Sequence, residues 1–290
     1  EPRDVYRAVS VPPGRMVFRG LACAVAACGV DAGLKRLGAA RGAAPQWSRR
    51  RNYRGHTVSL RGGVAVVFGA LGGVAAGGRA DRRLHEAALL AGGMAAIAGV
   101  FDDLAGSGSA RGFRGHVGAL HRGDVTTGTV KLAAIGCAGL AAGWRLADGR
   151  AVRRLAAGAV VAASANRANL LDLRPGRALK AVLVVSTPVV LSRGRGAAVA
   201  AAVAGVAAGT MRDDLRERTM LGDGGANCLG ALVGVALVAG ASTRRVVTEL
   251  AACVALTVAS ELVSFSRVID RTPVLRWFDR LGRAAESNDA

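Results

Sequence analysis

A polar break, ANLLDLRPGRALK from Ala168 to Lys180, separates two apolar runs near the middle of the chain. The flanking runs, at about 152–168 and 178–192, consist mostly of alanine, valine, leucine and glycine. The break holds a carboxylate, a Pro-Gly pair and arginines, which do not suit the interior of an apolar helix. The same alternation of apolar run and polar break continues along the chain, as in helical proteins that cross a membrane several times.

This alternation predicts an all-α fold, with one polytopic integral membrane domain over residues 1–290 and about nine transmembrane helices. A polar segment, 1–15, precedes the first span, and a cytoplasmic tail, 267–290, follows the last. Hydrophobic residues make up 51% of the chain and glycines number 41, which is typical of closely packed spans, although an alanine-rich soluble helical protein shares this composition. The expected spans lie at about 16–38, 58–78, 84–101, 130–147, 152–168, 178–192, 196–211, 228–242 and 246–266.

The net charge of +19 comes almost wholly from arginines, which lie between the apolar runs and not along one helix face. The sequence has no basic motif interleaved with aromatic residues, so we expect membrane lipids and phosphates as partners and no nucleic acid. The loops 39–57, 102–129, 169–177 and 212–227, together with the tail, carry more arginine and lysine than the other loops. The positive-inside rule makes these loops cytoplasmic, and the composition indicates the inner (plasma) membrane of a bacterium.

Four polar stretches fall on the predicted cytoplasmic side. They are RRRNYRGHTVSLRGG (Arg49–Gly63), GVFDDLAGSGSARGFRGHVGAL (Gly99–Leu120), NRANLLDLRPGR (Asn166–Arg177) and TMLGDGGANCLGALVG (Thr219–Gly234). Ionisable groups at the ends of membrane spans are functional candidates. The five cysteines lack the spacing of a metal or redox site, so the candidate metal ligands are the carboxylate oxygens. Oxygen ligands suit Mg²⁺, with Mn²⁺ as a substitute. Carboxylates, a metal ion and arginines together indicate phosphoryl transfer.

The order of these motifs resembles that of the polyprenyl-phosphate N-acetylhexosamine-1-phosphate transferase superfamily. The resemblance runs from about Asn52 to Gly234, and RGG, FDD, NRANLLD and LGDGG carry it. It implies Mg²⁺-dependent transfer of a sugar-1-phosphate from a UDP-sugar to an undecaprenyl or decaprenyl phosphate, with release of UMP, in bacterial cell-envelope glycan synthesis. Direct transfer and a two-step route through a covalent aspartyl intermediate both stay open.

The resemblance also implies roles for individual residues. Asp102 becomes the candidate general base near the acceptor phosphate, and Asp103 its orienting or metal-side partner. Asp223 in the Gly-Asp turn becomes the Mg²⁺ ligand. Arg61 opens a Gly-Gly segment like that of the family. The cluster that positions the nucleotide sugar and the metal consists of Asn166, Asn169 and Asp172.

The sequence departs from the family pattern in the loop that follows this cluster. Leu173 replaces a glycine and Pro175 stands where the family has a second aspartate. Arg174 and Arg177 are added, so we expect one of them to contact the donor's phosphates or an anionic group on its sugar. No histidine follows His121, whereas several family members carry a histidine-rich motif near the C-terminus. These departures argue against the peptidoglycan translocase itself.

Simpler interpretations stay open for several residues. The acidic pair can cap a span and meet a loop arginine, and the two asparagines can bridge helices by hydrogen bonds. Arg114 and His116 fit either a substrate loop or solvated positions, and Asp213 and Asp214 are interpreted as an exposed, charge-compensated loop. For the whole protein, the alternatives are a membrane transporter or lipid-handling protein and an inactive scaffold relative. A homodimer also stays open.

Overall fold

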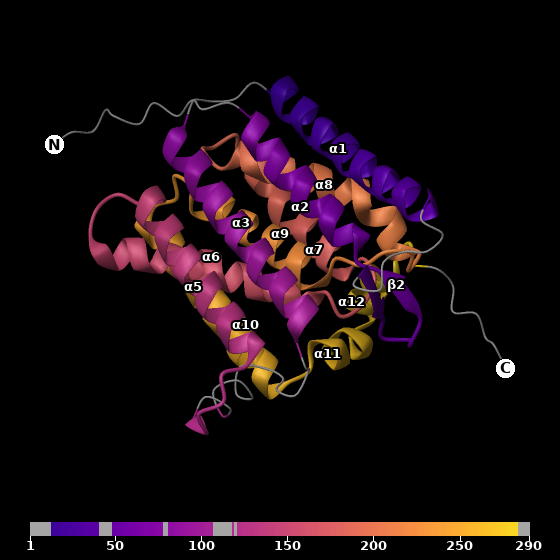
Figure 1. The fold of residues 1–290 in the computed structure, drawn as a ribbon. Coiled ribbons are helices and arrows are strands. Elements are labelled where there is room, and N and C mark those ends of the chain that lie inside the picture. Colours follow the sequence, from indigo (N-terminus) through magenta and orange to yellow (C-terminus); the bar gives the residue numbers. More distant parts are fainter. Residues whose placement is uncertain (1–12, 41–47, 78–80, 107–117, 119–120, 284–290) are drawn as a thin grey trace.

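The computed structural model describes residues 13–40, 48–77, 81–106, 118 and 121–283, which form eleven helices and one short hairpin (Figure 1). The strands β1 (Arg49–Arg51) and β2 (Thr57–Ser59) pair antiparallel. The predicted all-α fold class is confirmed. The helices are α1 (Pro13–Ala40), α2 (Arg61–Ala76), α3 (Arg82–Ala105), α5 (Thr127–Leu146), α6 (Ala151–Leu171), α7 (Arg177–Leu191), α8 (Ala197–Leu215), α9 (Gly222–Val238), α10 (Thr243–Leu262), α11 (Phe265–Arg271) and α12 (Pro273–Arg280).

Helix α9 forms the centre of the bundle, and its residues 224–238 are all buried. Helices α2, α3, α6 and α8 pack around it (Figure 1). Glycines bring α6 and α9 together: a Cβ on Gly230 would lie 2.3 Å from the Ser164 carbonyl oxygen, and one on Gly234 would lie 2.7 Å from the Val161 Cα. This backbone-to-backbone approach is the kind that small residues allow between membrane helices.

Two helices in the described part of the chain are long and apolar enough to cross a membrane, Val17–Arg36 within α1 and Arg82–Ala105. A third is present if α10 and α11, which are bent by 88° at the break between them, count as one span. Each of the nine expected segments contains a helix, but this test supports two or three spans and not nine. The other helices are either short, as α7 is with 15 residues, or charged, as α6 is through Arg153 and Arg154.

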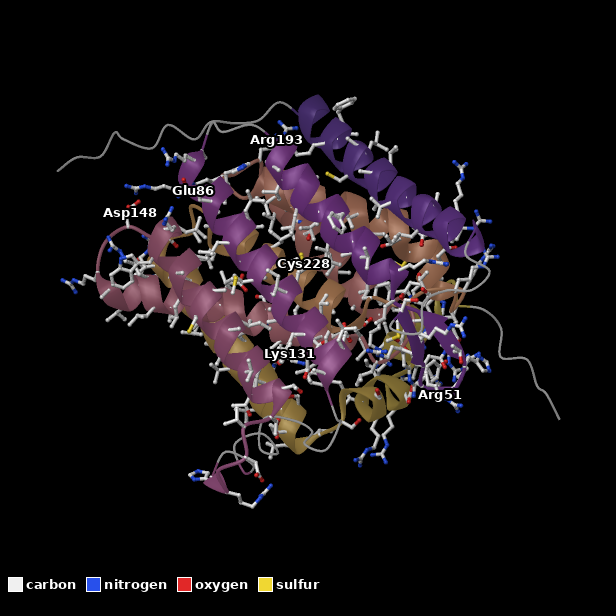
Figure 2. The ribbon with its side chains drawn as sticks, viewed as in Figure 1. Arg51, Glu86, Lys131, Asp148, Arg193 and Cys228 are labelled. Carbon is white, nitrogen blue, oxygen red and sulfur yellow. The ribbon has the colours of Figure 1, made fainter. Side chains whose placement is uncertain are left out.

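Successive helices run in alternate directions, so the predicted polar stretches gather at one end of the bundle. This end, called the site end, carries the C-termini of α3 and α6 and the N-termini of α5, α7 and α9. Figure 2 shows Lys131 and Arg51 at the site end, Glu86 and Asp148 at the opposite end, and Cys228 between them. The chain order of the helices therefore brings together segments that lie more than a hundred residues apart.

Two parts of the fold differ from the sequence prediction. Residues 49–59 form the β1–β2 hairpin, whose Ser59 also forms a parallel bridge with Thr219. The predicted tail, 267–290, contains most of α11 and all of α12, two short helices that the sequence did not predict and that fold back onto the site end (Figure 1). Both differences arise from short elements that are stabilised by contacts with distant segments and not by their own length.

Candidate functional site

The Gly-Gly segment and the LGDGG turn form one packing unit at the site end. A Cβ on Gly63 would lie 2.0 Å from the Leu221 carbonyl oxygen, and a Cβ on Gly99 would lie 2.3 Å from the Asp223 carbonyl oxygen. Gly222 has a φ of +61°, a left-handed conformation that favours glycine. Helices α2 and α3 therefore both contact the start of α9 through backbone atoms. These contacts fix the position of the Asp223 backbone, and with it the Cβ of Asp223.

Asp103 caps α9 from the end of α3. Its Oδ2 accepts a hydrogen bond from the Gly224 backbone N–H at 3.1 Å, and its carboxylate also accepts one from the Asp223 N–H. A carboxylate at a helix N-terminus pairs with free N–H groups and with the positive end of the helix dipole. Arg50 of β1 donates a hydrogen bond to the Asp103 carbonyl oxygen. The capping interpretation of the acidic pair therefore describes Asp103, which caps a different helix from its own.

Lys131, in the first turns of α5, joins the two remaining acidic motifs. Its ammonium group donates hydrogen bonds to Oδ2 of Asp102 and to Oδ2 of Asp223, and all three side chains are largely buried. The Thr127 side chain also hydrogen bonds to Asp102. Lys131 was not expected from the motifs. Two features of the sequence could have indicated Lys131 as a site residue. It is an isolated cation at the start of an apolar run, and lysine occurs at only three positions of the chain.

Asp172, in the turn after α6, completes a group of carboxylates at the site end. It accepts a hydrogen bond from the Gly222 backbone N–H. Burial raises the pKa of Asp172 well above its usual value, and the negative charges of Asp214, Asp223 and Asp103 raise it further. The structure therefore brings residues of the three acidic motifs together at the site end, as the sequence predicted.

The asparagines lie on the last turns of α6, just before Asp172. Asn166 and Asn169 are both half-buried. A third amide, Asn227 on α9, is buried and donates a hydrogen bond to the Asp223 carbonyl oxygen at 2.8 Å. Sequence reasoning did not single out Asn227, although it lies four residues after the aspartate that it supports.

A divalent metal site fits these residues only in an open form. In the described segments, no group of three histidine, cysteine, aspartate or glutamate side chains is arranged to hold a metal ion. Mg²⁺ needs fewer protein ligands than that, because it keeps several waters and takes one or two carboxylates plus substrate phosphates. The Asp102 and Asp223 carboxylates are close enough to share the Lys131 ammonium group, so their chemistry fits Mg²⁺ or Mn²⁺.

Arg61 lies in a separate cluster with α1. Its Nε is 3.4 Å from Oδ1 of Asp31, and Lys35 contacts both Asp31 and Asp213 at 2.6 Å. The structure therefore pairs Arg61 with α1 and does not place it among the acidic motifs. Asp213 and Asp214 were predicted to lie in an exposed loop, and this prediction was wrong for Asp214. Asp214 is buried in the last turn of α8, where its carboxylate accepts a hydrogen bond from the loop that precedes α7.

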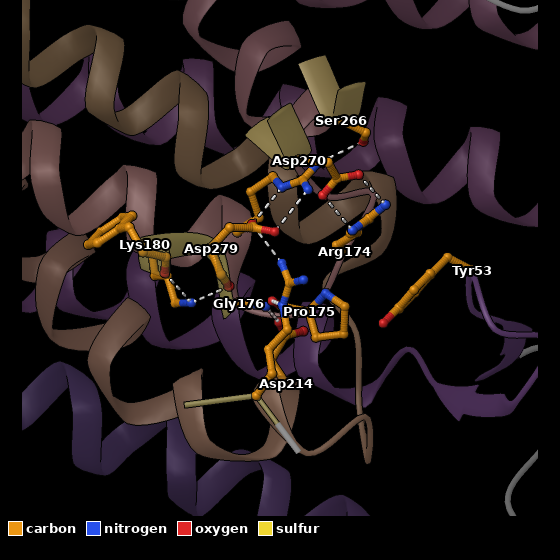
Figure 3. A network of polar contacts seen from close by, with 12 residues as sticks. Tyr53, Arg174, Pro175, Gly176, Lys180, Asp214, Ser266, Asp270 and Asp279 are labelled. Carbon is orange, nitrogen blue, oxygen red and sulfur yellow. Dashed lines mark hydrogen bonds and ion pairs between the residues drawn. The ribbon is translucent and has the colours of Figure 1, made fainter. Parts of the chain in front are cut away.

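The two added arginines bind the C-terminal helices (Figure 3). Arg177 is buried and forms a bidentate pair with Asp279 of α12, with distances of 2.8 and 3.1 Å, and also donates a hydrogen bond to Ser266 at 3.0 Å. Arg174 pairs with Asp270 of α11 at 3.0 and 3.2 Å. This arrangement does not support donor binding by these arginines, because aspartates of the same chain already occupy their guanidinium groups.

Further bonds hold α12 in this position. Lys180 donates hydrogen bonds to the carbonyl oxygens of Phe278 and Asp279 at 3.0 and 2.8 Å, and Arg283 contacts Asp279 at 2.6 Å. We call Arg177, Lys180, Asp279 and Arg283 the docking cluster. Burial alone would raise the pKa of Asp279, but the hydrogen bonds and charges of Arg177 and Arg283 outweigh it and hold this pKa below its usual value.

Pro175 and Gly176 shape the loop that leads into α7 and the docking cluster. The Pro175 carbonyl oxygen accepts a hydrogen bond from Arg283 at 2.9 Å, and the Gly176 N–H donates one to Asp214 at 2.5 Å. Gly176 has a φ of +73°, and a Cβ there would lie 2.4 Å from a Leu215 methyl group. The loop therefore connects α8 and the C-terminal segment through the backbone of Pro175 and Gly176.

Arg114 and His116 lie outside the described residues. No protein-family model matches the chain, and no curated protein matches it.

Proposed function

We propose that this protein transfers a sugar-1-phosphate from a UDP-sugar to a polyprenyl phosphate, with Mg²⁺, at the cytoplasmic face of a bacterial inner membrane. The observation that carries the proposal is the convergence of Asp102, Asp172, Asp223 and Lys131 at one end of an apolar helical bundle. These side chains come from four different helices or their ends, and the motifs that resemble the transferase superfamily supply three of them.

The reaction joins two phosphates that both carry negative charge. An oxygen of the lipid phosphate attacks the β-phosphorus of the UDP-sugar, a new P–O bond forms, and the bond to the bridging oxygen breaks, so UMP leaves with that electron pair. The lipid phosphate, with a second pKa near ~6, is largely ionised at neutral pH. Proton removal therefore contributes little, and Asp102 serves mainly to orient the acceptor and the Lys131 ammonium group.

Lys131 supplies a fixed positive charge between two carboxylates. In this position it reduces the repulsion between Asp102 and Asp223, and its ammonium group can donate a hydrogen bond to an incoming phosphate oxygen. When bound, Mg²⁺ would be held by Asp223, with Asp172 as a neighbouring carboxylate, and would neutralise charge on the donor's pyrophosphate. Asn166 and Asn169 would donate hydrogen bonds to the nucleotide sugar.

Carboxylates at one end of the bundle favour this reaction over transport, because a transporter places its charged groups near the middle of the membrane. The proposal does not require that every helix be long enough to cross the membrane by itself. Short alanine-rich helices can complete a bundle around two or three longer spans. The finer predictions of nine crossings and a cytoplasmic site end belong to the same proposal.

The test is UMP release from a panel of UDP-sugars by the purified chain in lipid bilayers with polyprenyl phosphate and Mg²⁺. Asp223→Asn should abolish release while the protein keeps its thermal unfolding temperature. Asp124→Asn is the matched control, because this carboxylate is 71% exposed in the same predicted loop, 102–129, as Asp102 and should leave the rate unchanged. Equal rates for parent and Asp223→Asn would reject the proposed site. An absence of UMP release for every sugar would favour the inactive scaffold.

A further inference from the structure

Helix α12 has an inverted distribution of polar and apolar side chains. Val274, Trp277, Phe278 and Leu281 lie on one helical face at spacings of three, four and seven residues, and all four are exposed, with exposed fractions of 73% for Val274 and 65% for Trp277. The buried residue of α12 is Asp279. A helix that faces water shows the opposite pattern, because the free energy gained by burying apolar surface directs such side chains inward.

The geometry of the preceding helices places α12 beside a bilayer. Helix α10 has the length and hydropathy of a span when it is taken together with α11, and it exposes Val254, Val258 and Leu262 along its length. The chain then turns by 88° between α10 and α11. If α10 runs along the membrane normal, α11 runs in the plane of the membrane at the site end. An amphipathic helix at that depth, with a tryptophan on its apolar face, is typical of the lipid–water interface.

The charge of this segment selects the lipid. Residues 263–283 contain five arginines and two aspartates, and each aspartate is paired with an arginine. Four of the five arginines in this segment are exposed: Arg267, Arg271, Arg276 and Arg280. Basic residues beside an apolar helical face are attracted to the negative potential of anionic lipid headgroups.

A groove next to the apolar face supports the same partner. It has a volume of about 270 Å³, opens outward between α7 and α12, and is mostly apolar, with Lys180 as its charged lining residue. Phe278 of α12 and the following Leu281 form one wall, and Lys180, Leu183, Val184 and Thr187 of α7 form the other. An acyl chain fits such a groove, whereas a water-filled surface groove would normally present more polar atoms.

We infer that α11 and α12 form an interfacial element that lies in the headgroup layer of an anionic leaflet. Trp277 and its apolar neighbours enter the acyl boundary, the exposed arginines meet lipid phosphates, and Asp279 faces inward to the docking cluster. The inference concerns a lipid contact of the C-terminal segment and does not depend on the proposed transferase activity.

Depth-dependent fluorescence quenching of the full chain in bilayers tests the placement of Trp277. The contribution of Trp277 is the difference between the parent and a Trp277→Phe variant. In bilayers of phosphatidylcholine and phosphatidylglycerol that contain brominated lipids, bromines near the headgroup should quench this contribution about twofold more than bromines near the acyl terminus. Quenching by aqueous iodide without quenching by any brominated lipid would overturn the inference.

A pair of arginine variants tests the role of lipid charge. Raising phosphatidylglycerol from none to about one third should increase the shallow quenching of Trp277, and Arg276→Gln with Arg280→Gln should reduce that increase about twofold or more. Arg193→Gln with Arg244→Gln is the matched control, because both are exposed and lie away from the site end, Arg193 before the start of α8 and Arg244 in the first turn of α10. The control pair should behave as the parent does.

Two outcomes of this comparison would also overturn the inference. An equal response of the test and control pairs would show that lipid charge acts elsewhere on the protein. Protection of Trp277 from both iodide and brominated lipids, together with cross-linking between copies through α12, would assign this apolar face to a second copy of the chain.

Discussion

Asp279→Asn should release α12 from the rest of the protein. The carboxylate is 5% exposed and accepts hydrogen bonds from Arg177 and Arg283, so the substitution leaves two buried guanidinium groups without their counter-charge. Breaking a buried ion pair by removing one partner costs about 3 kcal/mol or more, which corresponds to a rise of roughly a hundredfold in the undocked fraction of α12. The two hydrogen bonds from Lys180 to backbone oxygens remain and cannot replace the lost charge.

Hydrogen exchange of the backbone amides in α11 and α12 measures this change directly. In the variant, these amides should exchange about a hundredfold faster, while amides of α9 keep the parent rate. Asp270→Asn is the matched control, because this aspartate is 38% exposed and its pair with Arg174 contributes about 0–1 kcal/mol. If α11 and α12 of the Asp279→Asn variant exchanged at the parent rate, the pair of Arg177 with Asp279 would not hold α12 in place.

Three further predictions concern the site and the pH dependence of docking. Lys131→Met should abolish UMP release and Lys131→Arg should restore part of it; full activity of the methionine variant would exclude an electrostatic role. Gly99→Ala places a Cβ against the Asp223 carbonyl oxygen and should lower the stability by about 1–3 kcal/mol in thermal unfolding, whereas Gly93→Ala meets no atom within 4 Å and should not. Because the pKa of Asp279 is below its usual value, its contribution to docking is complete above about pH 4 and is lost as the pH falls through the folded pKa. The protection factors of the α12 amides, which compare each exchange rate with the intrinsic rate at the same pH, should therefore fall only in acid. Constant protection factors down to about pH 2 would contradict this sign.

The sequence located the helices well because apolar runs and polar breaks report directly on burial. It also predicted that three acidic motifs meet, since alternate helix ends must lie on the same side of a bundle. The number of spans was not predictable in the same way. Alanine and glycine occur both in spans and in buried helices of a bundle, and the test of length and hydropathy supports only two or three.

The errors at the site have a common physical cause. Asp279, the partner of Arg177, lies 102 residues away, and Asp223, one of the two partners of Lys131, lies 92 residues away. No local pattern indicates which distant carboxylate a cation will meet. The short helix α12 was missed because eight residues form a stable helix only when another part of the protein holds them. The added arginines were therefore assigned to a ligand when their partners belong to the chain itself.

The cap that Asp103 provides has a consequence for the energetics of a charged reaction. Asp102 and Asp103 are neighbours, as are Asp223 and Gly224, so the hydrogen bond from Gly224 to Asp103 sets the separation of the Asp102 and Asp223 backbones. Their carboxylates can change rotamer but cannot move apart with their helices. A polar environment fixed in this way reorganises little when charge shifts between two phosphates, and a low reorganisation energy speeds such a step without any increase in ground-state affinity.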